Sequence, residues 1–135
     1  RLHIYTPLRI QNNGTPLGPN NLSPKTFLTT LARRFTLLME FHAGQSYGEL
    51  VPAISTLAEQ IQVQSHDNLK WHNWIRYSSR QQQEMNLGGV IGSWDLTASQ
   101  AIWQSIWPWI YLGQWAHVGK NATMGMGHYS AEFLE

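Results

Sequence analysis

The sequence contains no cysteine among its 135 residues. Without thiols the chain can form neither a disulfide scaffold nor a thiolate zinc site, and this is consistent with a reducing compartment. Charge is also scarce, because nine Lys and Arg face eight Asp and Glu and the formal net charge is only +1. So weak a positive charge does not by itself indicate nucleic-acid binding.

Long apolar runs are missing as well. No stretch approaches the roughly 20 apolar residues that span a bilayer, and no signal peptide opens the chain. We therefore expect a cytoplasmic protein without a membrane partner. The chain begins with Arg1 rather than Met, which suggests a piece of a longer polypeptide, and its mass of 15.5 kDa is that of one domain.

Tryptophan, by contrast, is abundant. Seven tryptophans in so short a chain exceed what one core usually takes. Some are therefore expected on a surface that a ligand or a missing domain covers. Trp103, Trp107, Trp109 and Trp115 fall in one predicted helix and are interpreted as core or interface residues.

Alternating apolar residues predict four strands. The first is the segment "LHIYTPL" near the start of the chain. Two more are expected over residues 69–79 and 86–96, joined as a hairpin by the polar "RQQQEM", and the last over residues 128–133.

Helical spacing and capping residues predict three helices between these strands. The first runs over residues 23–44, from a Ser-Pro start to a glycine stop. A weaker helix is expected from Glu49 to Gln62. The third follows Thr97, which forms a capping box with Gln100, and Pro108 is expected to kink or interrupt it.

The predicted elements follow the order strand, helix, inserted helix, strand, strand, helix, strand. This order predicts an α+β, ferredoxin-like (RRM-like) split βαβ domain with the helices on one face of an antiparallel sheet. Alternation then places Leu2, Ile4, Ile75, Tyr129 and Phe133 toward the helices, and His3, Tyr5, His72, Trp74, Arg76 and His128 on the open face. Such an open face resembles those that stack RNA bases; alternatively, it packs against a second domain.

A glycine-rich loop, "AHVGKNATMGMGHY", precedes the last strand. It is not a nucleotide-phosphate loop, because Asn121 follows Lys120 where that motif has Ser or Thr, and Gly113 and Gly119 have the wrong spacing. A dinucleotide fingerprint is excluded too, since no third glycine follows Gly127 at the required place.

Three stretches together resemble a known family. The tail "LGQWAHVGKNATMGMGHYSAEF" is similar to the glycine-rich loop and last strand of the CRISPR precursor-RNA processing endoribonucleases of the RAMP superfamily. The segment "RYSSRQQQEMNLGGVIGSWDL" is similar to their arginine-rich hairpin, and "YTPLRI" with "LSPKTFLTTLARRFTLLMEFH" to their opening strand and helix. Such proteins usually carry two ferredoxin-like domains. Residues 1–135 match the C-terminal one, with the glycine-rich loop over residues 113–127, so the N-terminal domain of the parent would be absent.

The resemblance implies metal-independent cleavage of CRISPR repeat RNA, in which a 2′-hydroxyl attacks the adjacent phosphate and leaves a cyclic phosphate and a 5′-hydroxyl. The catalytic histidine of the family usually lies in the N-terminal domain, so no catalytic residue is assigned here and the fragment alone is predicted to be inactive. No cofactor and no metal are implied. The implied partners are repeat RNA, the N-terminal domain and subunits of a CRISPR effector complex, in a prokaryotic cytoplasm.

Glycines let the backbone approach a phosphate closely, and lysine adds a point charge. The residues expected to contact RNA are Gly119, Lys120, Asn121, Thr123, Gly125, Gly127 and His128 in the loop, with Arg76 and Arg80 on the hairpin. The simpler alternatives are a tight turn, a solvated lysine and ordinary surface arginines. Two other functions stay open: a non-catalytic RNA-binding RAMP subunit, and a protein-interaction domain that does not touch RNA.

Other polar residues have simpler interpretations. Arg33 and Arg34 are interpreted as surface residues of the first helix. His117 either orients RNA or is a buried structural histidine, and His42 is interpreted as structural. The spacing of His66, Asp67 and His72 is not diagnostic of a metal site.

Overall fold

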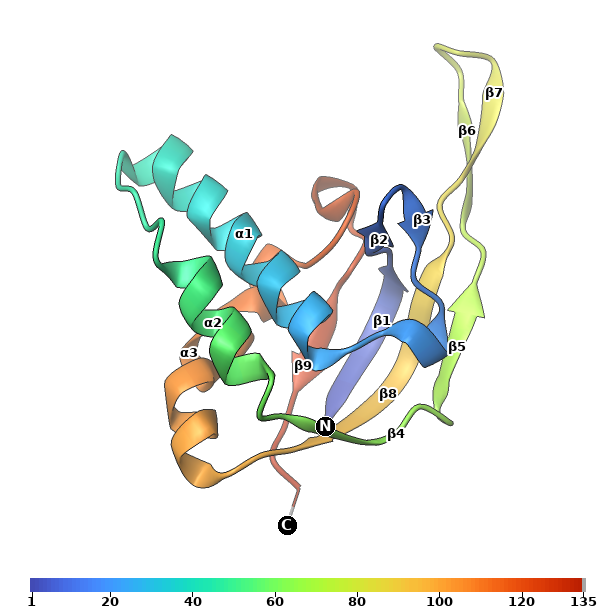
Figure 1. The fold of residues 1–135 in the computed structure, drawn as a ribbon. Coiled ribbons are helices and arrows are strands. Elements are labelled where there is room, and N and C mark those ends of the chain that lie inside the picture. Colours follow the sequence, from blue (N-terminus) through green and yellow to red (C-terminus); the bar gives the residue numbers. More distant parts are fainter. Residues whose placement is uncertain (135) are drawn as a thin grey trace.

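An antiparallel sheet forms around β1 (Leu2–Leu8) in the computed structural model, which describes residues 1–134 (Figure 1). The strand order is β4-β8-β1-β9, and β5 also pairs with β8. The other strands of this sheet are β4 (Gln62–Ser65), β5 (Leu69–His72), β8 (Gly89–Thr97) and β9 (Tyr129–Ala131). Leu2 of β1 lies opposite Trp94 of β8 and Ala131 of β9, so β1 is a central strand.

Three helices lie on one face of this sheet: α1 (Pro24–Ala43), α2 (Leu50–Ala58) and α3 (Gln100–Ala116) (Figure 1). The start of α1 is fixed by a capping box between Ser23 and Thr26, and its end by Gly44 in the left-handed conformation. The element order confirms the ferredoxin-like prediction, with α2 as the inserted helix.

The core lies between the helices and the sheet. Its largest fully buried side chains include Phe27, Trp94, Ile106 and Tyr129. The ring of Phe27 meets those of Tyr129 and Trp94 edge-on, with centroids 5.3 and 6.1 Å apart. Leu2, Ile4 and Tyr129 are buried, as alternation along the strands predicts. The register of β1 and β9 follows from this pattern.

The strand predicted over residues 69–79 is wrong as one element. It divides into β5, in the main sheet, and β6 (Ile75–Ser78), which pairs only with β7 (Gln83–Asn86) in a ribbon that projects from the sheet (Figure 1). The division falls where β8 begins, since His72 is opposite Gly89 and no further β8 residue is there to pair. Ile75 is therefore 63% exposed rather than turned toward the helices.

Helix boundaries also differ from prediction. The predicted helix over Glu49–Gln62 ends at Ala58, and β4 begins at Gln62. Thr97 is the last residue of β8 rather than a helix cap; Ser99 accepts the hydrogen bond from the Ile102 amide instead. Helix α3 is assigned without interruption through Pro108, with apolar residues buried on both sides of the proline.

The last strand is shorter than predicted, because β9 ends at Ala131. Phe133 lies beyond it and is 61% exposed, although its ring packs against Trp107 of α3 at 4.4 Å.

Smaller elements complete the chain: β2 (Gln11–Asn12), β3 (Thr15–Pro16), η1 (Pro19–Asn21) and η2 (Ala122–Met124). The first two form a short hairpin beyond the end of β1, and η2 lies within the glycine-rich loop. Over residues 1–134, no helix combines the length and apolar character needed to cross a membrane.

Candidate nucleic-acid interface

The glycine-rich loop is attached to the C-terminal end of β1. The Thr6 hydroxyl donates to the Gly125 carbonyl at 2.7 Å and accepts from the His128 amide at 2.9 Å. The Gly127 amide donates to the Pro7 carbonyl at 3.0 Å. Because these bonds join the returning half of the loop to a central strand, the sheet fixes the position of the loop.

The outgoing half of the loop meets the same end of β1. The Lys120 amide donates to the Arg9 carbonyl at 2.8 Å. A Cβ on Gly119 would lie only 2.6 Å from that carbonyl oxygen, and the residue has φ +91°. Glycine at position 119 is thus required by a close backbone approach within the protein.

The other two glycines of the loop differ in their surroundings. A Cβ on Gly127 would lie 1.7 Å from the Val118 carbonyl oxygen, so this position admits only glycine. Gly125 also has a positive φ, of +91°, but a Cβ there would have no neighbour within 4 Å. Its amide donates to the Ala122 carbonyl at 3.1 Å. The amides of both glycines are thus bonded inside the protein and are not free to bind a ligand.

Those side chains are accessible to different degrees. Lys120 and Thr123 are exposed, while Asn121 and His128 are half-buried. Asn121 has φ +59° and precedes η2. An ammonium and a hydroxyl on one loop can contact phosphate and ribose without reading a base.

Four rings form a row from the open face of the sheet to the glycine-rich loop. His117 stacks on His128 with centroids 5.0 Å apart and 25° between planes, and Tyr5 lies 5.4 Å from His128. His3 continues the row 6.3 Å from Tyr5. The open-face placement of His3, Tyr5 and His128 was predicted, but that of His117 was not, because only the folded loop brings positions 117 and 128 together.

The surroundings of His117 favour its neutral form. Burial is the main cause that lowers the pKa of His117, and the charges of His128 and Arg34 act in the same direction. The Nδ1 atom of His117 is buried and finds no hydrogen-bond partner in the described part of the chain. His117 is therefore neutral at pH 7.

Arg76 and Arg80 lie on the β6–β7 ribbon and are exposed. The ribbon continues from β5, and the loop is attached to the end of β1, so β8 lies between them in the sheet. The arginines lie on a ribbon that projects from the sheet, whereas the loop lies against the end of β1.

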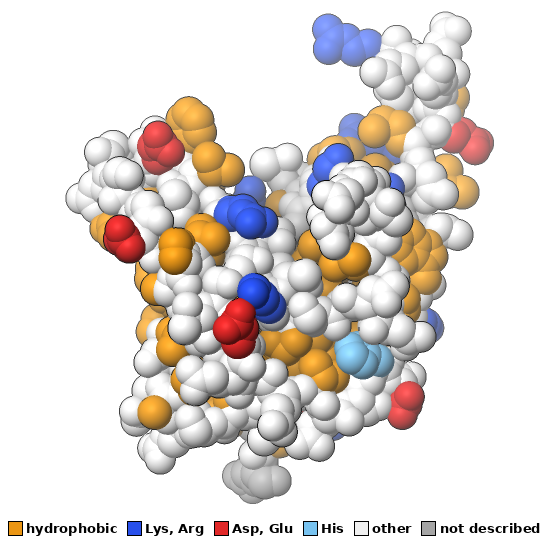
Figure 2. Space-filling view, viewed as in Figure 1, with side chains coloured by type: hydrophobic (Ala, Val, Ile, Leu, Met, Phe, Trp, Pro, Cys, Tyr) orange, Lys and Arg blue, Asp and Glu red, His pale blue; other side chains and the backbone are white. Residues whose placement is uncertain are grey.

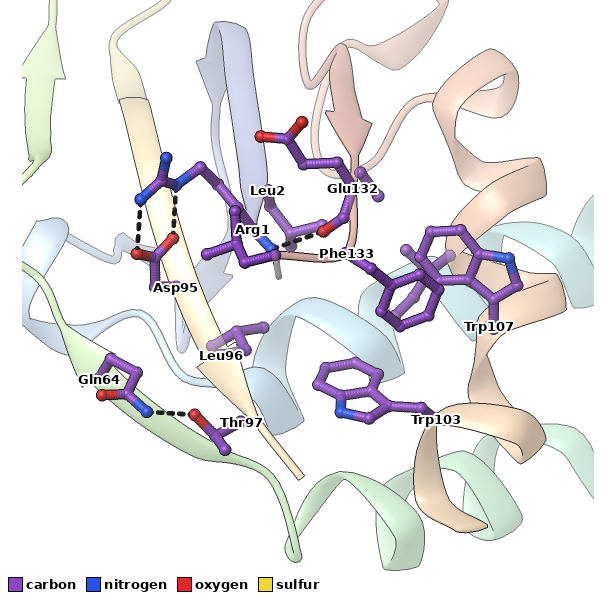
Figure 3. Close-up of a pocket in the computed structure, with 13 residues that line it drawn as sticks. Arg1, Leu2, Gln64, Asp95, Leu96, Thr97, Trp103, Trp107, Glu132 and Phe133 are labelled. Carbon is purple, nitrogen blue, oxygen red and sulfur yellow. Dashed lines mark hydrogen bonds and ion pairs between the residues drawn. The ribbon is translucent and has the colours of Figure 1, made fainter. Parts of the chain in front are cut away.

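A separate cavity of about 480 Å³ lies at the opposite end of β1 (Figure 3). At its rim Arg1 makes two hydrogen bonds to Asp95, at 2.8 and 2.9 Å, and Gln64 bonds to Thr97. The Arg1 guanidinium holds the pKa of Asp95 below its usual range. The aromatic wall includes Trp103, Trp107 and Phe133. The sequence pattern does not indicate this cavity, and its two lining carboxylates, Asp95 and Glu132, are paired with Arg1 and His3.

The remaining polar candidates are placed as follows. No group of three or more His, Asp and Glu side chains among residues 1–134 is arranged to hold a metal ion. The His66 Nε2 atom lies 2.9 Å from the Leu22 carbonyl oxygen, within hydrogen-bonding distance. His42 is exposed in the last turn of α1, at the end of the helix where the dipole favours a positive charge.

A split βαβ sheet with helices on one face, and a glycine-rich loop attached to its central strand, define a ferredoxin-like domain. The chain belongs to the family of the CRISPR-associated endoribonuclease Cas6, whose family model matches residues 2–129.

Solved Cas6 structures share this fold. A Cas6 product complex matches with a TM-score of 0.63 at 19% identity, over 98% of this chain and 50% of that chain. A Cas6 substrate mimic complex gives 0.60 at 20% identity, over 97% and 51%. A partial Cas6-RT-Cas1–Cas2 complex gives 0.68 at 17% identity, over 98% and 23%. The present chain thus spans about half the length of the Cas6 chains that it matches. No curated protein matches it significantly.

Proposed function

We propose that this chain is the C-terminal, RNA-binding domain of a Cas6 endoribonuclease that processes precursor CRISPR RNA. The observation that carries the proposal is the family match over residues 2–129, in a chain that covers only half of the Cas6 chains it resembles. The other half of the parent would be an N-terminal ferredoxin-like domain that supplies the catalytic residue.

In this proposal the glycine-rich loop holds the RNA backbone beside the cleavage site. Lys120 contributes a positive charge and Thr123 a hydroxyl, and both are exposed. His128 lies at the base of the loop, and its ring is next to that of Tyr5 on the open face of the sheet. Phosphate contacts of this kind set the position of an RNA strand without specifying its sequence.

The proposed reaction needs only proton transfer. The 2′-oxygen attacks the adjacent phosphorus and gives up its proton to a base, while the bond from phosphorus to the 5′-oxygen breaks and that oxygen takes up a proton. The products are a 2′,3′-cyclic phosphate and a 5′-hydroxyl. A histidine suits such acid–base chemistry because its pKa is close to neutrality.

The test is to incubate the full-length parent, and separately this chain, with end-labelled repeat RNA in EDTA, measuring binding and the chemistry of the product ends. We expect the parent to cleave and leave a cyclic phosphate, and this chain to bind without cleaving.

Two other results would favour different functions. Binding without cleavage by the parent, in EDTA and with magnesium alike, would indicate a non-catalytic RNA-binding RAMP subunit. Absence of binding by both proteins would contradict the RNA interpretation and favour a protein-interaction domain.

A further inference from the structure

A groove runs along α1, outside the glycine-rich loop and on the helical side of the sheet. Its first part lies between the C-terminal half of α1 and the loop, and includes Thr30, Arg33, Arg34, Phe41 and Gly119. Its second part lies between α1, α2 and the β2–β3 hairpin, and includes Gln11, Asn12, Lys25, Thr29, Thr30 and Arg33. Thr30 and Arg33 line both parts, so they form one continuous surface, here called the α1 groove. Figure 2 shows basic side chains along the hollow between α1 and the hairpin.

The charge of the α1 groove is of one sign. Its lining contains Lys25, Arg33 and Arg34, and no Asp or Glu of the described residues. Lys25 is paired with Glu59 at 2.7 Å. Arg33 is exposed and makes no hydrogen bond or ion pair within residues 1–134, so its full charge is available to a ligand.

Arg34 connects the groove to the glycine-rich loop. Its Nε atom donates to the Ala116 carbonyl at 2.5 Å, at the C-terminal end of α3, just before the loop begins. This arrangement satisfies a free carbonyl at the negative end of the helix dipole. The charge of Arg34 also reaches His117, whose pKa it helps to lower. The groove therefore adjoins the first part of the glycine-rich loop.

The uncharged lining suits RNA. The hydroxyls of Thr29 and Thr30 donate to the carbonyls of Lys25 and Thr26, at 2.7 and 2.6 Å. With the hydroxyl protons engaged, their oxygens remain as acceptors, and a ribose 2′-hydroxyl is a donor that can reach them. Phe41 is 79% exposed at the end of the groove and offers a ring on which a base can stack.

We propose that the α1 groove binds single-stranded RNA that continues from the glycine-rich loop, with phosphates on Arg33 and Arg34 and ribose hydroxyls on the threonines. This inference rests on the function proposed above. Lys25 and Arg34 are separated by about 14 Å of helix, at 1.5 Å per residue, which accommodates a few nucleotides.

The test measures the affinity of this chain for two fluorescein-labelled single-stranded RNAs, of about 5 and about 15 nucleotides, by anisotropy across a salt series. Arg33→Gln is expected to weaken binding of the long RNA roughly threefold to fivefold at 0.15 M salt, and to reduce the slope of log affinity against log salt by about 0.7, the value of one phosphate contact on a single strand. Binding of the short RNA should be unchanged.

Two further variants locate the effect. Lys120→Ala should weaken both RNAs, because the loop holds either of them. Gln104→Glu lowers the net charge by the same one unit at an exposed position on α3, outside the groove, the loop and the open face, and should weaken neither. In addition, 4-thiouridine at one end of the long RNA should crosslink to the peptide over residues 37–42.

The outcomes separate this inference from the proposed function. If Arg33→Gln behaves like Gln104→Glu with the long RNA while Lys120→Ala weakens it, the α1 groove is not an RNA site and the loop interpretation stands. Crosslinks of the long RNA that miss α1 also reject the groove. If neither RNA binds the wild-type chain, the proposed function fails and the inference fails with it.

Discussion

Gly125 and Gly127 are two residues apart in one loop, but the structure requires them for different reasons. Gly127→Ala would place a Cβ 1.7 Å from the Val118 carbonyl oxygen, at φ +69°. We expect a loss of stability of about 4 kcal/mol or a failure to fold. Gly125→Ala meets no atom within 4 Å and should cost about 1 kcal/mol for its positive φ alone. Urea unfolding of both variants checks this, and equal losses would contradict it.

His117 should make stability depend on pH. Its pKa is lowered in the folded protein, chiefly by burial, so the unfolded chain binds the proton more readily. Its neutral form therefore contributes stability that is fully present above the ordinary histidine pKa of about 6.5 and is lost as pH falls through that value toward the lower folded pKa.

This expectation is tested with the midpoint of thermal unfolding from pH 7.5 to 5.5. The wild-type midpoint should fall over this range, and His117→Gln should flatten the decrease. Gln104→Ala, at an exposed position in α3 that carries no titrating group, should keep the wild-type profile. A variant curve parallel to that of the wild type would show that other groups cause the pH dependence.

For single residues, the sequence predicts which side chains are buried better than it predicts which residues they contact. The alternation of Leu2 and Ile4 with His3 is local, so it correctly assigns the faces of β1. The bond from Arg34 to Ala116 joins residues 82 positions apart, and no local pattern contains it. For that reason, the interpretations of Arg34 as a surface residue and of His117 as an RNA-orienting or a buried structural histidine were incomplete.

The β6–β7 ribbon is the element most weakly tied to the rest of the fold. It is a two-stranded sheet of its own, closed at its base by a hydrogen bond from the Leu87 amide to the Trp74 carbonyl at 2.7 Å. Replacing residues 75–86 by Asn-Gly between Trp74 and Leu87 should therefore change the free energy of unfolding by less than about 1 kcal/mol.

The same replacement should weaken RNA binding if Arg76 and Arg80 contact phosphates. The salt slope should fall by about 1.4, for two lost contacts on a single strand. The double variant Arg76→Gln, Arg80→Gln keeps the ribbon and should give the same slope. Full wild-type affinity in both variants would rule out an RNA role for the ribbon.

Elements that bury one face are the ones the sequence predicts well. Helix α1 carries an apolar stripe, a capping box and a terminal glycine, and its predicted bounds are nearly correct. Strands β4, β6 and β7 are short, with side chains that are exposed or half-buried. Without a consistently buried face, alternation gives no signal, and these strands were missed or wrongly joined.

At the scale of the whole molecule, an exposed apolar surface lies on α3. Tyr111, Leu112 and Trp115 are 49%, 50% and 67% exposed, and the rings of Tyr111 and Trp115 are 5.0 Å apart. The double variant Tyr111→Ser, Trp115→Ser should keep the unfolding midpoint within a few degrees, because neither side chain lies in the core. It should bind less of an apolar fluorescent dye than the wild type. Equal dye binding would place the accessible apolar surface elsewhere.

The fold and family can be predicted from the sequence because periodicity, helix caps and the glycine-rich loop each depend on residues that are close together in the chain. Binding surfaces are harder to predict. The excess of tryptophan predicted a covered surface but not its position, and the α1 groove combines residues of α1, α2, β2 and the loop that only the folded chain brings together.

Strands β1 and β9 meet at their outer ends, where the Arg1 amine donates to the Glu132 carbonyl at 2.8 Å and the Glu132 amide to the Arg1 carbonyl at 3.0 Å. A mechanical force that separates these two ends would load this antiparallel pair one hydrogen bond at a time, as in unzipping, rather than all at once, as in shear. The domain should therefore yield at low force in a single-molecule experiment. Once the hydrogen bonds of Tyr5 and Pro7 break, the glycine-rich loop would detach from β1 while α1 is still folded. Tension on the chain would then release a ligand that is bound to the loop.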